Sequence, residues 1–260
     1  MDPFFLLSLG RAGSTVAMHA LNSIDGIYVF GEHNAALRNL KELHESFKKN
    51  AADQRSNAQA ILQKKYDNIW TAWATPFTPD ELLAKVTRSI NELYTKDIPL
   101  GTLRAWGIKE IKYDADDIIF FHKAWPDAKF VFLLRDMEAQ LVSWTIAFNK
   151  SQLSDDFLIE FLFKHQQFAM AASSLTQIFG GKCYTLRYEE MCSNPIDALK
   201  NVVCFLGLDD AVIDADKVRG VFKENVDFMP KKDKTDGDAM FLRARVKRIV
   251  KQFAESGKIG

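Results

Sequence analysis

The segment that most constrains the fold is the apolar run Phe130–Leu134, which lies between a Pro126-Asp127-Ala128 turn and Arg135. Successive side chains of a strand point to opposite faces of a sheet, so a strand with no polar position must be covered on both faces. Strands of this kind are typical of the middle of a parallel sheet with helices on both sides. The run therefore predicts a layered α/β fold built around this strand.

Short apolar segments alternate with helical segments along the chain. Further strands are predicted at Phe4–Leu9, Ile27–Phe30, Trp106–Lys109 and Cys183–Leu186. Helices are predicted at Thr15–Asn22, Ile118–Ala124, Ala139–Phe148, Phe157–Phe179 and Pro195–Leu206. The alternation predicts a doubly wound parallel sheet, and such sheets bind ligands at the carboxyl ends of their strands.

A single domain is expected, because 260 residues can bury one substantial core. From about residue 34 to residue 105 the chain is helical in character, with breaks at Pro76 and Pro79. We expect this insertion to cap the ligand cleft and to shape an acceptor pocket. Aromatic residues would line that pocket or, alternatively, pack in the core; they are Trp70, Trp73, Phe77, Tyr94 and Trp106.

Composition limits the partners and the location. The 34 basic and 34 acidic residues give a formal net charge of zero, so no overall field attracts nucleic acid or an anionic membrane. No segment approaches the roughly 20 apolar residues of a membrane span, and Phe4–Leu9 is too short for a signal peptide. The three cysteines lack metal-ligand spacing, which indicates reduced thiols and a cytoplasmic protein.

The turn Gly10-Arg11-Ala12-Gly13-Ser14-Thr15 joins the first predicted strand to the first helix. Its two glycines let successive N–H groups point at one anion, and the helix adds the positive end of its dipole. Arg11 adds a full charge, and the Ser14 and Thr15 hydroxyls add donors. No Lys precedes Ser14 or Thr15, which favours a metal-free phosphate site over a magnesium-triphosphate site. Alternatively, the turn binds nothing.

Arg135 is the second candidate for anion binding. It follows the central strand, where a charge is costly without a partner, and its planar fork suits bidentate contact with a phosphate. Ser143, eight residues later, could donate a further hydrogen bond. Alternatively, Arg135 pairs with Asp136 or Glu138. Two anion sites at strand ends suggest a ligand with two separated phosphate groups.

Three segments, in this order, resemble the nucleotide-dependent sulfotransferase family. Leu9–Thr15 is similar to the family's 5′-phosphosulfate loop, and Phe130–Asp136 with Ser143-Trp144 is similar to its 3′-phosphate segment. The run Leu186–Met191, followed by Asn194-Pro195 and Phe205–Leu208, resembles its downstream signature. There are two departures. Ala12 replaces the usual loop serine, and the family's Gly-rich basic segment is absent, so that Lys231-Lys232-Asp233-Lys234 either replaces it or is a solvated face.

The resemblance implies a P-loop-like three-layer sandwich with a mostly parallel sheet flanked by helices. It also implies transfer of a sulfuryl group from 3′-phosphoadenosine 5′-phosphosulfate (PAPS), without a metal, to a hydroxyl or amine of a small molecule such as a secondary metabolite. The product would be adenosine 3′,5′-bisphosphate (PAP). The residues implied to bind the nucleotide are Gly10, Arg11, Ala12, Gly13, Ser14, Thr15, Arg135, Ser143 and Tyr188.

Transfer requires a base for the acceptor proton and cations for the developing negative charge. Glu32 lies 21 residues after Arg11, the spacing at which the tyrosylprotein branch of the family carries its base in a Gly-Glu pair. His33 is the rival base, since an imidazole titrates near neutrality. Lys109 resembles the lysine that neutralises the transferring group, with Arg11 as a second cation. Alternatively, Lys109 forms an ion pair with Glu110 or Asp114, and Tyr188 is a packing residue.

Two other functions compete with sulfuryl transfer. A P-loop kinase or nucleotide hydrolase would use a similar loop with magnesium and a triphosphate, but the loop lysine is missing. A non-catalytic nucleotide-binding relative would keep the fold without the chemistry, and Glu32 and Lys109 argue against it.

Overall fold

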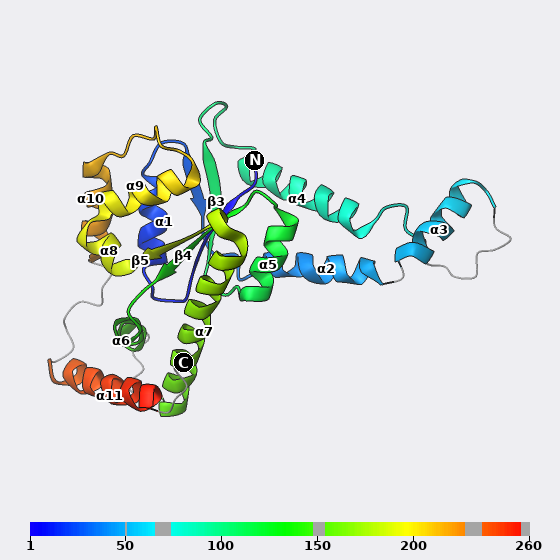
Figure 1. The fold of residues 1–260 in the computed structure, drawn as a ribbon. Helices are drawn as coiled ribbons and strands as arrows, with labels where there is room; N and C mark the ends of the chain where they lie inside the picture. The colour runs from blue at the N-terminus through cyan, green and yellow to red at the C-terminus, as the bar shows by residue number, and fades with distance from the viewer. Residues whose placement is uncertain (50, 66–73, 148–153, 227–235, 256–260) are drawn as a thin grey trace.

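The computed structural model describes residues 1–49, 51–65, 74–147, 154–226 and 236–255, and its five strands form one sheet (Figure 1). The strand order is β2-β3-β1-β4-β5, and every pairing is parallel. The strands are β1 (Phe4–Ser8), β2 (Ile27–Phe30), β3 (Ala105–Glu110), β4 (Lys129–Leu134) and β5 (Cys183–Arg187). All carboxyl ends therefore meet at one edge.

Strand side chains alternate between two apolar cores, one on each face of the sheet. Phe5 of β1 and Phe130 of β4 stack at 5.4 Å between ring centroids in the first core. Leu6 and Val131 point into the second core on the opposite face. The fully apolar β4 is thus buried on both sides, as its sequence predicts.

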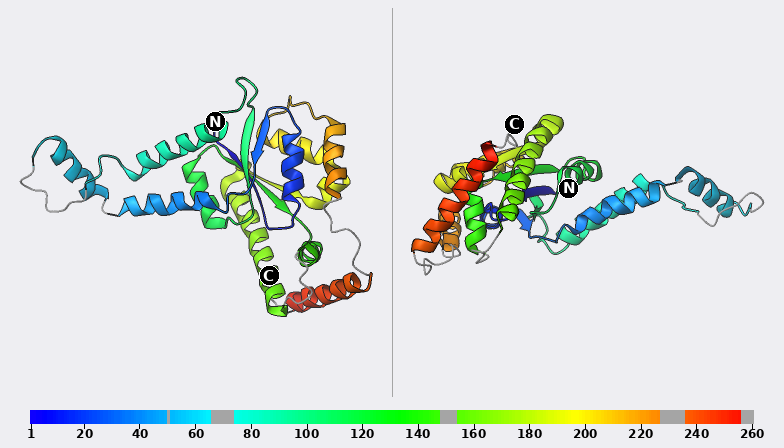
Figure 2. Two further views of the ribbon diagram at one scale, coloured as in Figure 1. Left: turned by 180° about the vertical axis from the view of Figure 1, so that it is seen from behind. Right: turned by 90° about the horizontal axis from the view of Figure 1, so that it is seen from below.

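Helices cover both faces of the sheet (Figures 1 and 2). The first core is closed by α5 (Ala115–Ala124), α7 (Asp155–Phe179) and part of α4 (Pro79–Thr95). The second core is closed by α1 (Ser14–Asn22), α8 (Tyr188–Ser193), α9 (Pro195–Leu206) and α10 (Ala215–Val226). A P-loop-like three-layer α/β sandwich results.

A smaller third core lies beyond the carboxyl edge of the sheet. The first half of α7 extends past the sheet and packs there against α6 (Met137–Ala147) and α11 (Asp236–Glu255). Leu141 of α6 and Leu158 of α7 are fully buried in this cluster. It sits next to the edge where the expected ligand residues lie.

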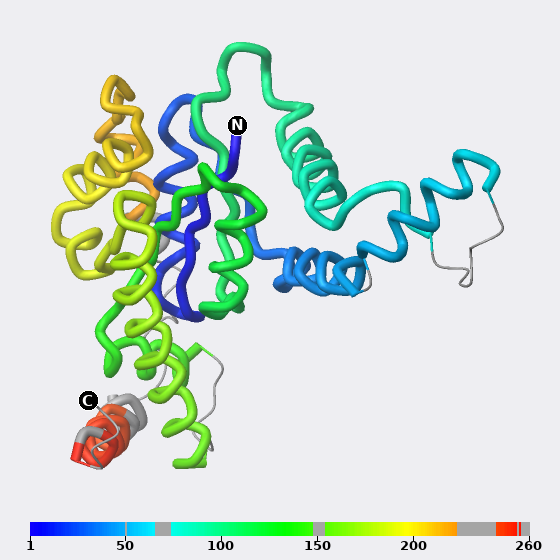
Figure 3. The backbone as a smooth tube through the Cα atoms, turned by 45° about the vertical axis from the view of Figure 1, so that its right-hand side comes forward, coloured from blue at the N-terminus to red at the C-terminus, as the bar shows by residue number. Residues whose placement is uncertain are grey.

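The insertion forms an arm that projects from the sandwich (Figure 3). Its elements are the 3₁₀ turn η1 (Ala36–Arg38), α2 (Asn39–Lys48), α3 (Ala51–Leu62) and α4. Thr78 and Glu81 cap α4 reciprocally, which fixes its start at Pro79. Buried His44 of α2 lies 3.0 Å from Asp80 of α4 and 3.1 Å from Lys123 of α5, so it ties the arm to the body.

The predicted strands are confirmed, and the predicted helices agree within a few residues. Helix α5 begins at Ala115 rather than Ile118 because Asp114 caps it, and α7 begins at Asp155 because Ser154 does the same. The sequence did not predict α8, α10 or α11. Trp70, Trp73, Phe148 and Lys231–Lys234 lie outside the described residues.

Three further observations concern the described part of the chain. None of its helices is long and apolar enough to cross a bilayer. Cys183 is buried and Cys192 and Cys204 are exposed, all as free thiols. Within the same ranges, no cluster of His, Cys, Asp and Glu side chains could hold a metal ion.

Candidate functional site

The expected ligand residues lie at the carboxyl edge of the sheet. The loop Gly10–Thr15 follows the central strand β1, and Glu32 follows β2. Arg135 follows β4, and Tyr188 opens α8 directly after β5. Lys109 is the next-to-last residue of β3, so each of the five strands contributes at its end.

The loop at the end of β1 depends on Gly13. Its φ is 92°, in the left-handed region, and a Cβ there would lie 2.3 Å from the Tyr188 ring. Only glycine adopts this φ readily and also leaves room for the Tyr188 ring. Arg11 also has a left-handed φ, of 67°, which turns its exposed side chain outward at the loop tip. Ala12 is buried in the second core, so the position of the usual serine faces apolar side chains here.

The first turn of α1 is open to a ligand. Thr78, Asp114 and Ser154 cap other helices with their side chains, whereas α1 has no side-chain cap and no acidic residue in its first turn. The first N–H groups of a helix have no carbonyl partner within the helix. Arg11, beside this turn, has no acidic partner within 4 Å among the described residues. These donors and this charge are of the kind that binds anions at helix N-termini.

Arg135 touches the loop directly. Its Nη1 donates to the Arg11 carbonyl oxygen at 2.9 Å, and its guanidinium stacks 4.2 Å from the centre of the Tyr188 ring. Its Nε is buried, and no described residue is its hydrogen-bond partner. Among the described residues it forms no ion pair, so the alternative pairing with Asp136 or Glu138 is wrong. The two predicted anion-binding segments are therefore adjacent.

Polar residues that sequence reasoning missed hold this arrangement. Gln140 is buried and donates from Nε2 to the Gly10 carbonyl oxygen at 2.8 Å. His165 Nε2 lies 2.9 Å from the Arg135 carbonyl oxygen, and Glu189 accepts from the Asp136 amide at 2.8 Å. These contacts join residues that are 30, 53 and 130 positions apart in the sequence, so no local pattern could have indicated them.

Ser143 and Tyr188 complete the second segment. Ser143 is half-buried on α6, the helix that follows Arg135. Tyr188 is half-buried between Gly13 and Arg135, and burial raises the pKa of its phenol. Tyr188 therefore packs against the protein, and it does so next to the loop Gly10–Thr15.

Lys109 and Glu32 form an ion pair across neighbouring strand ends. The Lys109 side chain is only 5% exposed, whereas that of Glu32 is 38% exposed. Lys109 points to the α1 face, because its register partner Leu6 packs in the second core. Glu110 points to the opposite face, so the alternative pairing of Lys109 with Glu110 is wrong, as is that with Asp114, which caps α5.

His33 is turned toward the arm rather than toward Lys109. Its Nε2 shares a hydrogen bond of 3.1 Å with the Tyr94 hydroxyl of α4, and its Nδ1 is buried without a partner. Tyr94 in turn stacks on the buried Trp106 ring at 5.1 Å. Tyr94 and Trp106 are therefore packed within the protein, and Tyr94 links the insertion to the turn after β2.

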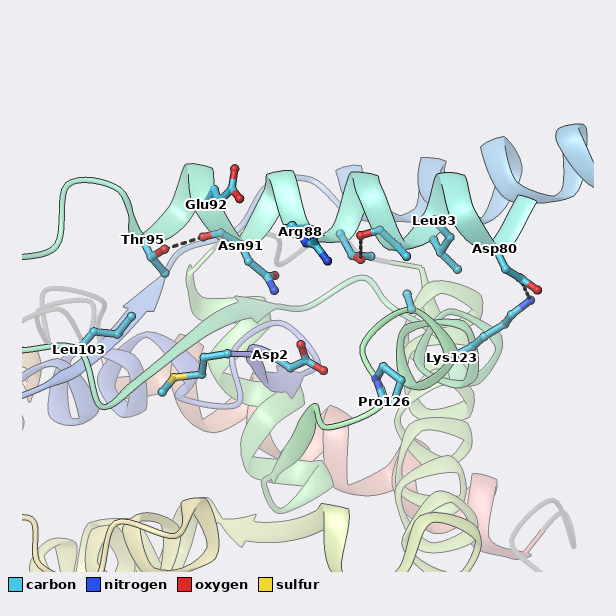
Figure 4. Close-up of a pocket in the computed structure, with 14 residues that line it drawn as sticks. Asp2, Asp80, Leu83, Arg88, Asn91, Glu92, Thr95, Leu103, Lys123 and Pro126 are labelled. Carbon is cyan, nitrogen blue, oxygen red and sulfur yellow. Dashed lines mark hydrogen bonds and ion pairs between the residues drawn. The ribbon is translucent and has the colours of Figure 1, made fainter. Parts of the chain in front are cut away.

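One cavity among the described residues lies away from these groups. It has a volume of about 660 Å³ and is lined by Met1, Asp2 and Pro126 together with the inner side of α4 (Figure 4). These residues stand at the amino ends of the strands, at the edge opposite to the loop. A cavity of this size is a candidate ligand site, but none of the expected ligand residues lines it.

A parallel sheet with an uncapped, glycine-containing turn after its central strand defines an α/β protein of the P-loop-like class. The "Sulfotransferase family" model matches residues 3–212. The chain belongs to the sulfotransferase family, whose members transfer sulfuryl groups. No curated protein sequence matches it.

Solved structures of low identity share the fold. Mouse sulfotransferase SULT7A1 complexed with PAP is 13% identical, with a TM-score of 0.51 over 90% of this chain and 67% of that one. The sulfotransferase domain of the Synechococcus PCC 7002 olefin synthase is 15% identical, with a TM-score of 0.46 over 94% of both chains. A sulfotransferase from Alicyclobacillus acidocaldarius is 16% identical, with a TM-score of 0.47 over 95% of this chain and 96% of that one.

The left-handed turn at Gly13 can be tested by substitution. Gly13→Ala adds backbone strain and a clash with the Tyr188 ring, so we expect it to lower the free energy of unfolding by at least about 1–3 kcal/mol in urea denaturation. Gly10→Ala in the same loop is the control, since its Cβ would make only an ordinary contact with Ile111 at 3.8 Å. Equal stabilities of the two variants would contradict the described loop.

The burial of His165 leads to a pH dependence of stability. Burial lowers the pKa of His165 below its ordinary 6.5, although the Arg135 carbonyl and Asp136 act in the opposite direction. The unfolded chain then binds the proton more tightly, so stability must fall as the pH drops from about 6.5 through the lower folded pKa. Urea unfolding between neutral and mildly acidic pH should show a shallower fall for His165→Gln. The control His19→Gln, at an exposed position of α1, should retain the fall, and an unaltered fall in His165→Gln would refute the assignment.

Proposed function

We propose that this sulfotransferase uses PAPS as donor and sulfates a hydroxyl or amine of a small-molecule acceptor. The observation that carries the proposal is the direct contact between the two anion-binding segments, through the hydrogen bond from Arg135 to the Arg11 carbonyl. One ligand with two separated phosphate groups can contact both. PAPS carries such groups at its 5′ and 3′ positions.

The residues present fit a doubly phosphorylated nucleotide. A buried guanidinium nitrogen without a partner is costly in an apolar surrounding, and Arg135 Nε is such a donor. An uncapped helix start supplies further N–H donors beside it. In this proposal Gly10–Thr15 hold the 5′-phosphosulfate, and Arg135 and Ser143 hold the 3′-phosphate. Tyr188 lies along the nucleotide, and the PAP complex of the mouse enzyme with a similar fold supports this choice of ligand.

PAPS supplies an activated sulfuryl group when bound, and the remaining chemistry falls to side chains of this protein. Glu32 takes the proton of the acceptor hydroxyl or amine. Lys109 holds the Glu32 carboxylate in place through the ion pair, and Lys109 and Arg11 place positive charge where negative charge develops. No metal is part of this proposal.

Glu32 is preferred over His33 as the base because of where the two side chains point. Glu32 is partly exposed and next to Lys109, so an acceptor can reach it. The His33 ring is engaged by Tyr94 on one nitrogen and buried at the other. For a general base, access to the proton comes before its intrinsic pKa.

The acceptor side is proposed to be shaped by the insertion at residues 34–105. Tyr94 is the described contact between the insertion and the turn that carries Glu32 and His33. The neutral net charge favours a small metabolite over a charged polymer and speaks against nucleic acid or a membrane surface as partner. A kinase or nucleotide hydrolase is disfavoured because Ser14 follows Gly13 rather than Lys.

Calorimetric titration distinguishes these functions. PAP should bind more tightly than magnesium-ATP, and transfer from PAPS should be detected across a panel of small phenols, alcohols and amines. Tighter binding of ATP would sink the proposal. Binding of PAP without transfer to any acceptor would favour the non-catalytic relative.

Arg135→Ala removes the proposed contact with the 3′-phosphate. A hydrogen bond to a charged group contributes about 1.5–3 kcal/mol, so PAP affinity should fall by about 10- to 150-fold in titration calorimetry. Arg88→Ala is the matched control, because Arg88 is exposed on α4 and lines the cavity at the opposite edge. Retention of full PAP affinity in Arg135→Ala would remove Arg135 from the site.

Glu32→Gln removes the proposed base but keeps the shape of the side chain. Turnover should fall by about 10²-fold or more, with little change in PAP affinity, because general-base catalysis contributes roughly 10²–10⁴-fold. His33→Gln should keep most of the turnover. The reverse ranking of the two variants would make His33 the base.

A further inference from the structure

Glu110 is a buried carboxylate with an unusual set of partners. It is the last residue of β3 and is 1% exposed. Its Oε2 accepts from the amides of His33 at 3.2 Å and Ala35 at 2.8 Å, and its Oε1 accepts from the Ile111 amide at 2.8 Å. Within the described residues no basic side chain lies within 4 Å of it, so backbone N–H groups stabilise the charge.

The turn that Glu110 binds is a strained one. Asn34 and Ala35 have φ values of 55° and 57°, in the left-handed region that non-glycine residues rarely adopt. Residues in this conformation persist only where their surroundings hold them. Hydrogen bonds to a charged acceptor are the strong kind, and two of them end on this turn. Glu110 is therefore the group that holds residues 33–35 in this shape.

This turn begins at the residue after Glu32. Lys109 and Glu110 are consecutive in β3, so their side chains leave opposite faces of the same strand end. Lys109 binds the Glu32 carboxylate on one face, while Glu110 binds the backbone after Glu32 on the other. A second tie, from Lys112 to the Asn34 side chain, reinforces the turn. The end of β3 thus holds both the carboxylate of Glu32 and the backbone that follows Glu32.

We propose that Glu110 is a positioning residue for Glu32: its carboxylate holds the 33–35 turn and thereby aims the base. The inference rests on the proposed function, in which Glu32 takes the acceptor proton. It adds a residue that touches neither substrate nor nucleotide. Its effect on the reaction therefore has to pass entirely through Glu32.

Glu110→Gln keeps the side-chain shape but replaces one accepting oxygen by an NH₂ group that cannot accept an N–H. We expect kcat to fall by about 10- to 100-fold, the loss typical of a misplaced catalytic group, and PAP affinity to stay within about twofold. Amide hydrogen exchange, measured by NMR on the full chain, should accelerate at His33 and Ala35. This second readout does not depend on turnover.

Combination with Glu32→Gln separates positioning from a general structural role. If Glu110 acts through Glu32, adding Glu110→Gln to Glu32→Gln should leave kcat unchanged from that of Glu32→Gln alone. Asp117→Asn is the matched control, since Asp117 is a buried carboxylate on the same side of the sheet that binds the Arg38 side chain. It should leave His33 and Ala35 exchange and kcat near the wild-type values.

The outcomes separate the two proposals. Full turnover in Glu32→Gln would overturn the base assignment, whatever Glu110 does. If Glu32→Gln is slow but Glu110→Gln has normal turnover or unchanged amide exchange, the inference about Glu110 is overturned and the base assignment stands. Additive losses of kcat in the double variant would have the same meaning. If Glu110→Gln does not fold, Glu110→Asp, which keeps the charge but shortens the reach, takes its place in the same measurements.

Discussion

The structure depends on one constraint, which is that all five described strands run in the same direction. Parallel strands need both faces covered, and this accounts for the two apolar cores and the helical layers that close them. Parallel strands also bring every carboxyl end to one edge. Residues that are more than a hundred positions apart in sequence become neighbours for this reason, as when the Arg135 side chain donates to the Arg11 carbonyl oxygen.

Three basic residues lie at that edge, although the chain has no net charge. Arg11, Lys109 and Arg135 all lie at the carboxyl ends of central strands. The nearby carboxylate Glu110 is kept on the opposite face, where backbone N–H groups stabilise it instead of these cations. Glu32 lies among these cations through its ion pair with Lys109, and Asp136 and Glu189 lie next to Arg135. The charges at this edge are therefore arranged locally, without an overall field from the chain.

Part of the fold and of the candidate site could be predicted from short-range patterns in the sequence. The two-sided apolar run of β4 and the glycine turn after β1 are short-range features, so the strands, the layers and the position of the loop and Arg135 at the carboxyl edge could be predicted. The partners of Lys109 could not, because Glu110 is adjacent in sequence yet faces away, while Glu32 is 77 residues distant and faces toward it. The left-handed residues Asn34 and Ala35 were also beyond prediction, since a buried carboxylate from another strand holds them.

The cavity and the candidate ligand residues lie at opposite edges of the sheet. The cavity of about 660 Å³ lies at the amino edge, where Asp80, Lys123 and Asp2 already have protein partners. Asp80 is bound to Lys123 and His44, which lower its pKa, and Asp2 accepts from the Asp127 amide. At the carboxyl edge Arg135 Nε has no partner, and the first turn of α1 has no cap. Buried donors without partners are costly, so a ligand that supplies acceptors gains most where they occur. By this criterion the carboxyl edge is the better candidate for the binding edge.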